Sequence, residues 1–241
     1  MDSEAKRRII VALDFPRLNE ALRMARKLAR CVGMFKVGKQ LFTAAGPEAL
    51  RKLSALGPRI FLDLKYHDIP NTVAGAVRAA VQLPGVALLN VHALGGRAMM
   101  EAAVKAMPRG PGRPKLLAVT ILTSLDQHAL REVGIQGTPH DRAVRLAQLA
   151  RECGIDGVVA SPLEVRSIRK ACGPDFLIVP QGIRPAGGRL HDQKRTATPA
   201  ETIRNGADFL GVGRAITQAA DPRAAATEIV AEIAQALRGK N

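Results

Sequence analysis

Short apolar runs of β-type residues alternate with longer segments of helical periodicity along the whole chain, and this alternation constrains the fold most strongly. Strands are expected at Arg8–Asp14, Met34–Gly38, Ile60–Lys65, Ala87–His92, Lys115–Leu122, Gly157–Ser161, Phe176–Pro180 and Phe209–Gly213. Helices are expected at Asn19–Cys31, Pro47–Leu56, Thr72–Leu83, Arg97–Met107, Asp141–Cys153, Leu163–Cys172, Pro199–Asn205 and Pro222–Leu237. Pro47, Pro199 and Pro222 stand where the first turn of a helix tolerates proline.

The expected strands are nearly continuous apolar runs, which is typical of parallel strands covered by helices on their outer face. Eight strand–helix units in 241 residues match the usual size of a TIM barrel. A doubly wound open sheet is the alternative, but no G-x-G-x-x-G motif follows the first expected strand. Because no polar linker divides the chain, the sequence predicts an α/β protein with a single (β/α)8 barrel domain over residues 1–241.

One segment breaks the pattern of short connections. Residues 184–198 are polar, rich in glycine and almost without apolar anchors. Connections of this length inside a compact barrel are usually functional lids or disordered segments. Since the segment follows the seventh expected strand, it belongs to the catalytic face, and the sequence predicts a lid loop there.

The formal net charge of +15 is compatible with a nucleic-acid-binding protein or with a site for an anionic ligand. The basic residues are spread along the chain, however, and aromatic residues make up only 3%, with no Trp and one Tyr. Stacking platforms for single strands are therefore nearly absent, and no nucleic-acid partner is expected. Most of the charge is expected to be solvated helix surface, with part of it around an anionic small molecule.

The sequence also bears on the location of the protein. The longest apolar runs, such as Ile9–Leu13, are too short to cross a bilayer, and no membrane partner is expected. The N-terminal residues lack the pattern of a secretory signal, so a cytoplasmic protein is expected. Cys31, Cys153 and Cys172 show no C-x-x-C spacing and are expected to be reduced thiols, not metal ligands or a disulfide framework.

Charged residues recur at the ends of the expected strands, where the chemistry of a barrel gathers. Asp14 ends the first strand and Lys36 lies in the second. Asp63 and Lys65 are two residues apart, so a regular strand projects both side chains from one face, and Asp68 follows. Lys and Asp are rarely buried unless paired, so Lys36, Asp63, Lys65 and Asp68 are expected to form a Lys–Asp–Lys–Asp array; a solvated salt-bridge cluster is the alternative.

Such an array suits the loss of CO2 from an sp2 carbon. The reaction leaves a carbanion, and an ammonium group beside it stabilises the charge and can then deliver a proton. Flanking carboxylates keep Lys65 charged, whereas a Schiff-base lysine needs a depressed pKa. A metal ion between Asp63 and Asp68 would compete with that lysine for the same oxygens, so no metal site is predicted.

A phosphate site is expected at the last two strands. Gly211–Arg214 ends the eighth strand, where glycine lets backbone N–H groups approach a phosphate and Arg214 offers a charged fork. Gly182–Arg184 ends the seventh strand and adds a second arginine. TIM barrels often bind phosphate with the loops that follow these two strands.

One string of residues is highly specific. Residues 63–72, with the pattern D-x-K-x-x-D-I-P-N-T, resemble the signature of the orotidine 5′-phosphate decarboxylase family. The resemblance extends in order from Ile9 to the last helix, through Val11–Asp14, Phe35–Gly38, Leu122–Ser124, Gly182–Arg184, Asp192–Arg195 and Gly211–Arg214.

The resemblance implies a homodimeric carboxy-lyase that converts orotidine 5′-phosphate to uridine 5′-phosphate, the last step of de novo pyrimidine nucleotide synthesis, without metal or organic cofactor. Lys65 is implied as the proton donor, working with Lys36 and Asp63, while Asp68 and Thr72 reach into the neighbouring subunit's site. The implied substrate contacts are Asp14 and Lys36 at the ribose, Thr123 or Ser124 at the pyrimidine edge, and Arg184, Gln193, Gly213 and Arg214 at the phosphate. Asp63, Ile69 and Thr72 are implied as further substrate-binding residues.

Two positions need a separate interpretation. The family usually has T-P-G-I-R after the seventh strand, whereas this chain has Pro180 followed by Gln181, so the backbone path into the lid is expected to differ. His92 ends the fourth expected strand, where a packing or hydrogen-bonding role is favoured over proton transfer.

Two other functions are alternatives. A metal-dependent sugar-phosphate decarboxylase or aldolase, such as 3-keto-gulonate 6-phosphate decarboxylase, shares the D-x-K-x-x-D pattern but lacks the I-P-N-T continuation, and chelator would abolish its activity. A basic nucleic-acid-binding barrel without catalysis would show a steep salt dependence of binding, but it leaves the Lys–Asp array unexplained.

Overall fold

Eight parallel strands form one sheet in the computed structural model, which describes residues 3–184 and 197–239. The strand order is β7-β6-β5-β4-β3-β2-β1-β8. The strands are β1 (Ile9–Ala12), β2 (Met34–Gly38), β3 (Arg59–Tyr66), β4 (Val86–His92), β5 (Lys115–Val119), β6 (Gly157–Ala160), β7 (Leu177–Pro180) and β8 (Leu210–Val212). Each predicted strand is present, and the largest difference is at β5, which ends at Val119 and not at Leu122.

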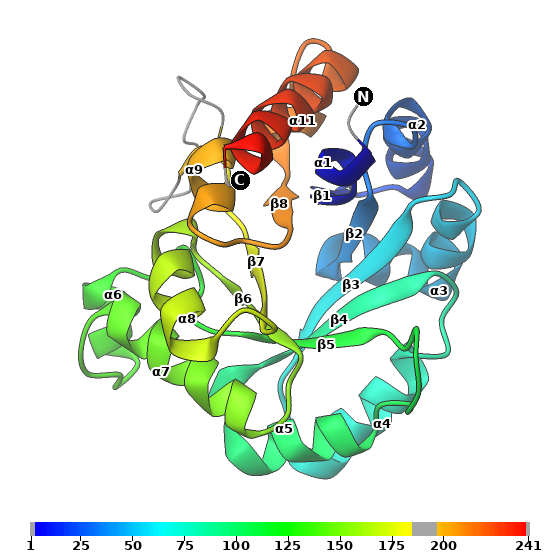
Figure 1. The fold of residues 1–241 in the computed structure, drawn as a ribbon. Coiled ribbons are helices and arrows are strands. Elements are labelled where there is room, and N and C mark those ends of the chain that lie inside the picture. The colour runs from blue at the N-terminus through cyan, green and yellow to red at the C-terminus, as the bar shows by residue number, and fades with distance from the viewer. Residues whose placement is uncertain (1–2, 185–196, 240–241) are drawn as a thin grey trace.

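The sheet curves into a nearly closed barrel (Figure 1). β8 pairs in parallel with β1, which joins the last strand to the first. β7 and β8 meet through a bridge between Gln181 and Gly211 and through a hydrogen bond of 3.0 Å from the Asp208 amide to the Ile178 carbonyl. The predicted (β/α)8 architecture is therefore confirmed.

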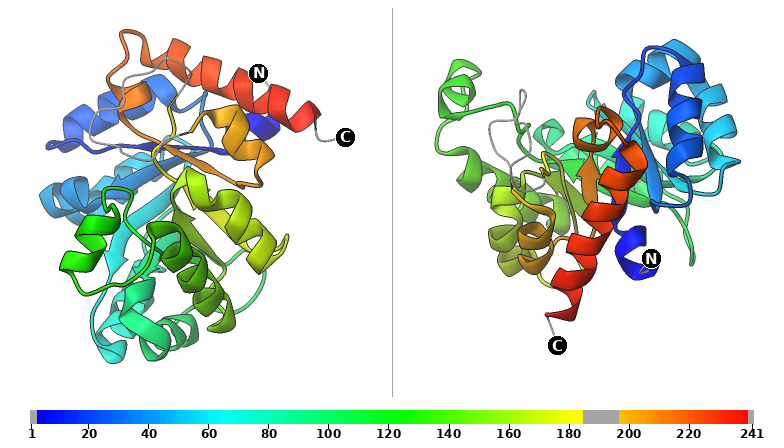
Figure 2. Two further views of the ribbon diagram at one scale, coloured as in Figure 1. Left: turned by 90° about the vertical axis from the view of Figure 1, so that its left-hand side faces the viewer. Right: turned by 90° about the horizontal axis from the view of Figure 1, so that it is seen from above.

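Helices cover the outer face of the barrel, as the three directions of Figures 1 and 2 show. The α-helices are α1 (Ser3–Arg7), α2 (Leu18–Leu28), α3 (Lys39–Ser54), α4 (Pro70–Ala80), α5 (Gly96–Lys105), α6 (Gln127–Glu132), α7 (Pro139–Glu152), α8 (Val165–Cys172), α9 (Pro199–Arg204), α10 (Arg214–Thr217) and α11 (Pro222–Arg238). Two 3-10 turns, η1 (Ala93–Gly95) and η2 (Pro162–Glu164), precede α5 and α8.

All eight predicted helices are present, but the prediction missed several short ones. α1, α6 and α10 span four to six residues each, too few to show a clear helical period. α3 begins at Lys39, well before the predicted start. Its backbone leaves the helical conformation at Gly46 (φ 55°), so Pro47 does open a helical segment after a kink.

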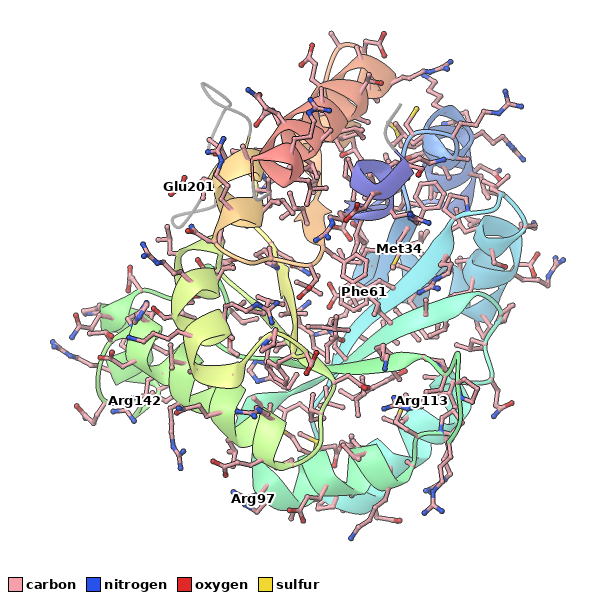
Figure 3. All side chains as sticks on the ribbon, viewed as in Figure 1. Met34, Phe61, Arg97, Arg113, Arg142 and Glu201 are labelled. Carbon is pink, nitrogen blue, oxygen red and sulfur yellow. The ribbon has the colours of Figure 1, made fainter. Side chains whose placement is uncertain are left out.

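The core lies on both faces of the strands. One cluster fills the inside of the barrel, where Figure 3 shows Met34 and Phe61 within the ring of strands. Its buried members are Ile10, Met34, Phe61, Leu88, Leu117, Val119, Val159 and Val179. A larger cluster joins the other face of the strands to the helices and includes Val11, Phe35 and Leu62. Burial on both faces explains the nearly continuous apolar runs in the sequence.

Three further predictions concern the surroundings of the barrel. Across the described ranges, no helix combines the length and the apolar character needed to cross a membrane. Cys31, Cys153 and Cys172 were predicted to be reduced thiols; they are free, and all three are buried. Of the predicted lid, residues 185–196 lie outside the described part of the chain, and Ile183 pairs with Ala197 on either side of them.

Candidate active site

The C-terminal ends of β1, β2, β3, β7 and β8 border a cavity of about 650 Å³. A barrel directs chemistry to this face because the loops that follow the strands converge there. Seven of the residues predicted for the site line the cavity together: Asp14, Lys36, Asp63, Lys65, Arg184, Gly213 and Arg214.

Asp63 is the centre of the charged group, and its side chain is only 1% exposed. Its Oδ2 lies 3.3 Å from Lys36 Nζ and accepts a hydrogen bond from Gln181 Nε2 at 3.4 Å. Its Oδ1 accepts hydrogen bonds from Lys65 Nζ at 2.6 Å and from Asn90 Nδ2 at 2.7 Å. Four nitrogen atoms therefore surround one carboxylate and occupy the acceptor positions of both oxygens.

These neighbours keep the buried groups ionised. Burial raises the pKa of the Asp63 carboxyl, but the charges of Lys36 and Lys65 and the hydrogen bonds outweigh it and hold that pKa well below its usual range. Burial likewise opposes the charge of Lys36, yet Asp63 and Asp14 raise its pKa above the ordinary value. Lys36 Nζ donates to Asp14 Oδ1 at 3.0 Å. Three members of the predicted array, Lys36, Asp63 and Lys65, are thus paired, and Asp14 joins them.

Lys65 has an unusual backbone conformation. Its φ is 53°, the one positive φ outside glycine among the described residues, and the pairing of β3 with β4 shifts register between Leu62 and Tyr66. Regular alternation along a strand was the expected reason for Lys65 and Asp63 to meet, and that reason is wrong, because the strand is irregular at the lysine. The two side chains meet nevertheless, with the Lys65 side chain 21% exposed.

Asp68 does not join the array within one chain. Its Oδ1 accepts a hydrogen bond from the Ile69 amide at 2.6 Å, and the described residues give it no ion pair. Residues 67–72 are all exposed, Ile69 by 67%. Thr72, the predicted start of a helix, lies in the first turn of α4, because that helix begins at Pro70, a residue suited to the first helical position.

The opposite side of the cavity is electropositive. Arg184 is 7% exposed, and burial together with the charge of Arg214 lowers its pKa. An anion between the two guanidinium groups would relieve that repulsion. A Cβ at Gly211 would lie 2.9 Å from Gln181 Cγ, so glycine permits the close approach of β7 and β8. Gln193, the remaining residue predicted at the phosphate, lies outside the described residues.

Not every predicted substrate contact lines this cavity. Thr123 and Ser124 follow β5 and, in the described part of the chain, are not among the residues that line it. His92 stacks on His67 with ring centroids 5.3 Å apart, and its Nδ1 accepts from the Leu94 amide at 3.3 Å. These contacts are of the packing and hydrogen-bonding kind predicted for His92.

The sequence prediction missed Asn90 and assigned no contact to Gln181. Asn90 is fully buried in β4, and the only signal for it was an amide inside the apolar run V-A-L-L-N-V. Gln181 was noticed as a departure from the family pattern, and it lies in the cavity wall against Asp63. Thr217 and Gln218 also line the cavity from α10 and its end, which carried no sequence signal.

Comparisons with known proteins agree with this geometry. Residues 7–229 match the model of the Orotidine 5'-phosphate decarboxylase / HUMPS family. The chain is 55% identical to the orotidine 5′-phosphate decarboxylase of Moorella thermoacetica, with 95% of this chain and 93% of the relative covered. It is 57% identical to that of Trichlorobacter lovleyi, with 95% and 96% covered.

Solved structures show the same architecture. The crystal structure of orotidine 5′-phosphate decarboxylase from Lactobacillus acidophilus superposes with a TM-score of 0.81 at 40% identity, covering 93% of this chain and 98% of that one. That of Pyrococcus horikoshii gives a TM-score of 0.75 at 26% identity, covering 94% and 99%. The predicted barrel and the predicted carboxy-lyase class are thus confirmed. The chain belongs to the orotidine 5′-phosphate decarboxylase / HUMPS family.

Proposed function

We propose that this chain decarboxylates orotidine 5′-phosphate to uridine 5′-phosphate, the last step of de novo pyrimidine nucleotide synthesis, without a cofactor. The relatives bearing that activity in their names align with this chain over nearly its whole length. The observation that carries the proposal is the Lys65 ammonium, which is 2.6 Å from a buried carboxylate and borders a cavity with two arginines on its other side.

The cavity suggests how the nucleotide lies. Its phosphate would sit between Arg184 and Arg214, against the backbone of Gly213, with Gln193 reaching it from the lid. Asp14 and Lys36 would hydrogen-bond the ribose. The orotate ring would then point its carboxylate towards Asp63 and Lys65, with Thr123 or Ser124 at the other ring edge.

The chemical step needs one proton and no redox partner. The bond from C6 to the carboxylate carbon breaks, its electron pair stays on C6, and CO2 leaves. The Lys65 ammonium stabilises the developing carbanion and then transfers a proton from Nζ to C6, after which the neutral amine regains a proton from solvent. Asp63 holds the Lys65 ammonium at 2.6 Å, and its other oxygen lies 3.3 Å from Lys36 Nζ.

The donor set of the site supports a reaction without metal. Both oxygens of Asp63 are already bound to nitrogen donors, and a metal ion would have to displace the reacting lysine from one of them. Among the described residues, no group of three or more His, Cys, Asp or Glu side chains is arranged to hold a metal ion.

The exposed segment after β3 supports a shared site. Residues 67–72 lie at the catalytic rim, and Ile69 is a large apolar side chain that is 67% exposed. We propose that this segment packs on a second copy in a two-fold homodimer, with Asp68, Ile69 and Thr72 entering the partner's cavity. The partner's Asp68 would then complete the four-residue charged array. The cytoplasmic location expected from the sequence stays a prediction.

A spectrophotometric assay with orotidine 5′-phosphate, run with and without EDTA, tests the function. Turnover that is unchanged by the chelator is expected. Activity that vanishes in EDTA and returns with a divalent cation would instead favour the metal-dependent sugar-phosphate decarboxylases or aldolases. Absence of turnover in both conditions, with folded protein, would rule out the proposal.

A further inference from the structure

Asn90 is a polar side chain that the reaction itself does not use. It is 0% exposed, near the middle of β4, among apolar neighbours such as Leu89 and Val91. A buried amide costs free energy unless its hydrogen bonds are made, at about 1–3 kcal/mol for each unsatisfied group. A purely structural strand position would favour a branched apolar residue here, so its contacts need an explanation.

Both ends of the Asn90 amide bind the catalytic array. Its Oδ1 accepts a hydrogen bond of 2.8 Å from the backbone amide of Lys65. Its Nδ2 donates a hydrogen bond of 2.7 Å to Asp63 Oδ1, the same oxygen that binds Lys65 Nζ. The orientation of the amide follows from its partners, since a backbone N–H can only donate and an ionised carboxylate can only accept.

The backbone of Lys65 depends on this contact. A left-handed conformation costs a non-glycine residue about 1–2 kcal/mol. It also accompanies the shift of register between β3 and β4, which interrupts the regular pairing of the two strands there. The Lys65 amide finds its acceptor in the Asn90 side chain, which thereby holds the lysine in the irregular conformation.

We infer that Asn90 is a positioning residue for the decarboxylation, fixing the Lys65 backbone and the Asp63 carboxylate relative to each other so that the ammonium stands at the reacting carbon. The inference rests on the proposed function. Neither contact reaches substrate: one holds the main chain of the proton donor, and the other holds its counter-ion. A displacement of about 1 Å at a reacting group can cost about 100-fold in rate, which is the scale of effect expected here.

Two substitutions and one control separate positioning from stability. Asn90→Ala removes both hydrogen bonds. Asn90→Asp is nearly isosteric and keeps an acceptor for the Lys65 amide, but it removes the donor and places a second carboxylate beside Asp63. The control, Asp156→Asn, weakens the ion pair between Asp156 and Arg113 (2.7 Å) at the start of β6, away from the cavity.

The kinetic result expected for Asn90→Ala is a fall in kcat of about 100-fold. The inhibition constant of uridine 5′-phosphate should change little, because Asn90 does not line the cavity. Amide hydrogen exchange in a peptide that contains Lys65 should become faster in this variant. Asp156→Asn should lower the melting temperature, keep the parent kcat and leave that exchange unchanged.

The pH profile of Asn90→Asp gives a readout that a structural role would not move. Two adjacent carboxylates share one proton more readily as the pH falls, and the shared proton restores a hydrogen bond between positions 90 and 63. The ratio of variant to parent kcat should therefore rise with decreasing pH, whereas the ratio for Asn90→Ala should stay flat.

The outcomes are distinguishable. A parent enzyme without turnover of orotidine 5′-phosphate would refute the proposed function. The exchange of the Lys65 amide would still test, by itself, whether Asn90 holds the Lys65 backbone. If the parent is active, two results would overturn the inference. One is a kcat of Asn90→Ala equal to that of the parent, and the other is unchanged hydrogen exchange at Lys65 in this variant. Where the alanine variant does not fold, Asn90→Asp carries the test, and a flat activity ratio against pH would then refute it.

Discussion

A buried carboxylate is tolerated only when its oxygens find donors, and Asp63 binds four. Two of them are lysines and Asp14 adds a second carboxylate, so the charges of this four-residue group balance before a ligand arrives. The ammonium of Lys65 therefore stands ready at the position where negative charge develops in the reaction. Such preorganisation avoids the cost of rearranging dipoles during the reaction, which is the main source of electrostatic catalysis.

Lys65→Ala is expected to lower kcat by at least about 1000-fold, since it removes proton delivery and charge stabilisation together. Binding of uridine 5′-phosphate should persist, because Arg184 and Arg214 are unchanged. Steady-state kinetics and inhibition by the product measure the two effects. Lys52→Ala is the matched control, since Lys52 pairs with Glu48 on the surface of α3. Near-normal turnover in Lys65→Ala would exclude the lysine as the proton donor.

At the scale of elements, the sequence allowed the strands and the charged residues at their ends to be predicted, because apolar runs and their final residues are local features. It gave no sign of the irregularity in β3, since lysine has no preference for the left-handed region that glycine signals. Asn90 was missed for a related reason. Its partners, Lys65 and Asp63, lie 25 and 27 residues away in the sequence, and only the pairing of β3 with β4 brings them together.

His92, the last residue of β4, also makes the stability of the fold depend on pH. Burial, then the charges of His67, Lys65 and Lys39, lower the pKa of His92 from 6.5 to about 4. Between these values the unfolded chain binds a proton that the folded chain does not, so the free energy of unfolding falls as the pH falls from 6.5 to 4.

His92→Asn is expected to remove this dependence while it keeps an acceptor for the Leu94 amide. The parent should lose up to about 3 kcal/mol more than the variant between pH 7 and pH 4. Urea unfolding at several pH values measures the difference, with the exposed His128→Asn on α6 as the control. Equal slopes for parent and His92→Asn would show that His92 titrates normally in the folded state.

The residues that follow β7 and β8 are expected to support catalysis by binding the phosphate of the substrate. Arg214→Ala should lower kcat/KM by about 10- to 100-fold, as the loss of a charged hydrogen bond predicts. Added phosphite dianion should activate the parent enzyme on a truncated substrate without phosphate, because remote binding energy is used to organise the site. Arg223→Ala on α11 serves as a control. The absence of phosphite activation would argue against a phosphate-driven lid.

At the scale of the whole molecule, the main prediction is a site built by two chains. Lys65→Ala and Asp68→Ala homodimers should each be severely impaired. In a mixture that exchanges subunits, each heterodimer has one doubly damaged site and one intact site, which combines Lys65 of one chain with Asp68 of the other. Activity should therefore reappear on mixing.

The readout is turnover before and after exchange, with heterodimer formation verified by tagged subunits. When both residues serve the same subunit's site, every site in the mixture carries one lesion. Activity that stays at the level of the separate variants, despite verified exchange, would rule out the shared site. An exposed control such as Lys52→Ala should mix without any change in activity.

The bridge between Gln181 and Gly211, where β7 meets β8, has a consequence for the lifetime of the enzyme. Arg184 and Arg214 stand on the two sides of this seam. With the proposed contacts, a bound phosphate binds both arginines and so links the two strands that close the barrel. A ligand that binds only the folded state stabilises it by about 2.7 kcal/mol at 100 times its dissociation constant. The supply of nucleotide would thereby protect the enzyme from proteolysis, and starvation for nucleotide would shorten its survival.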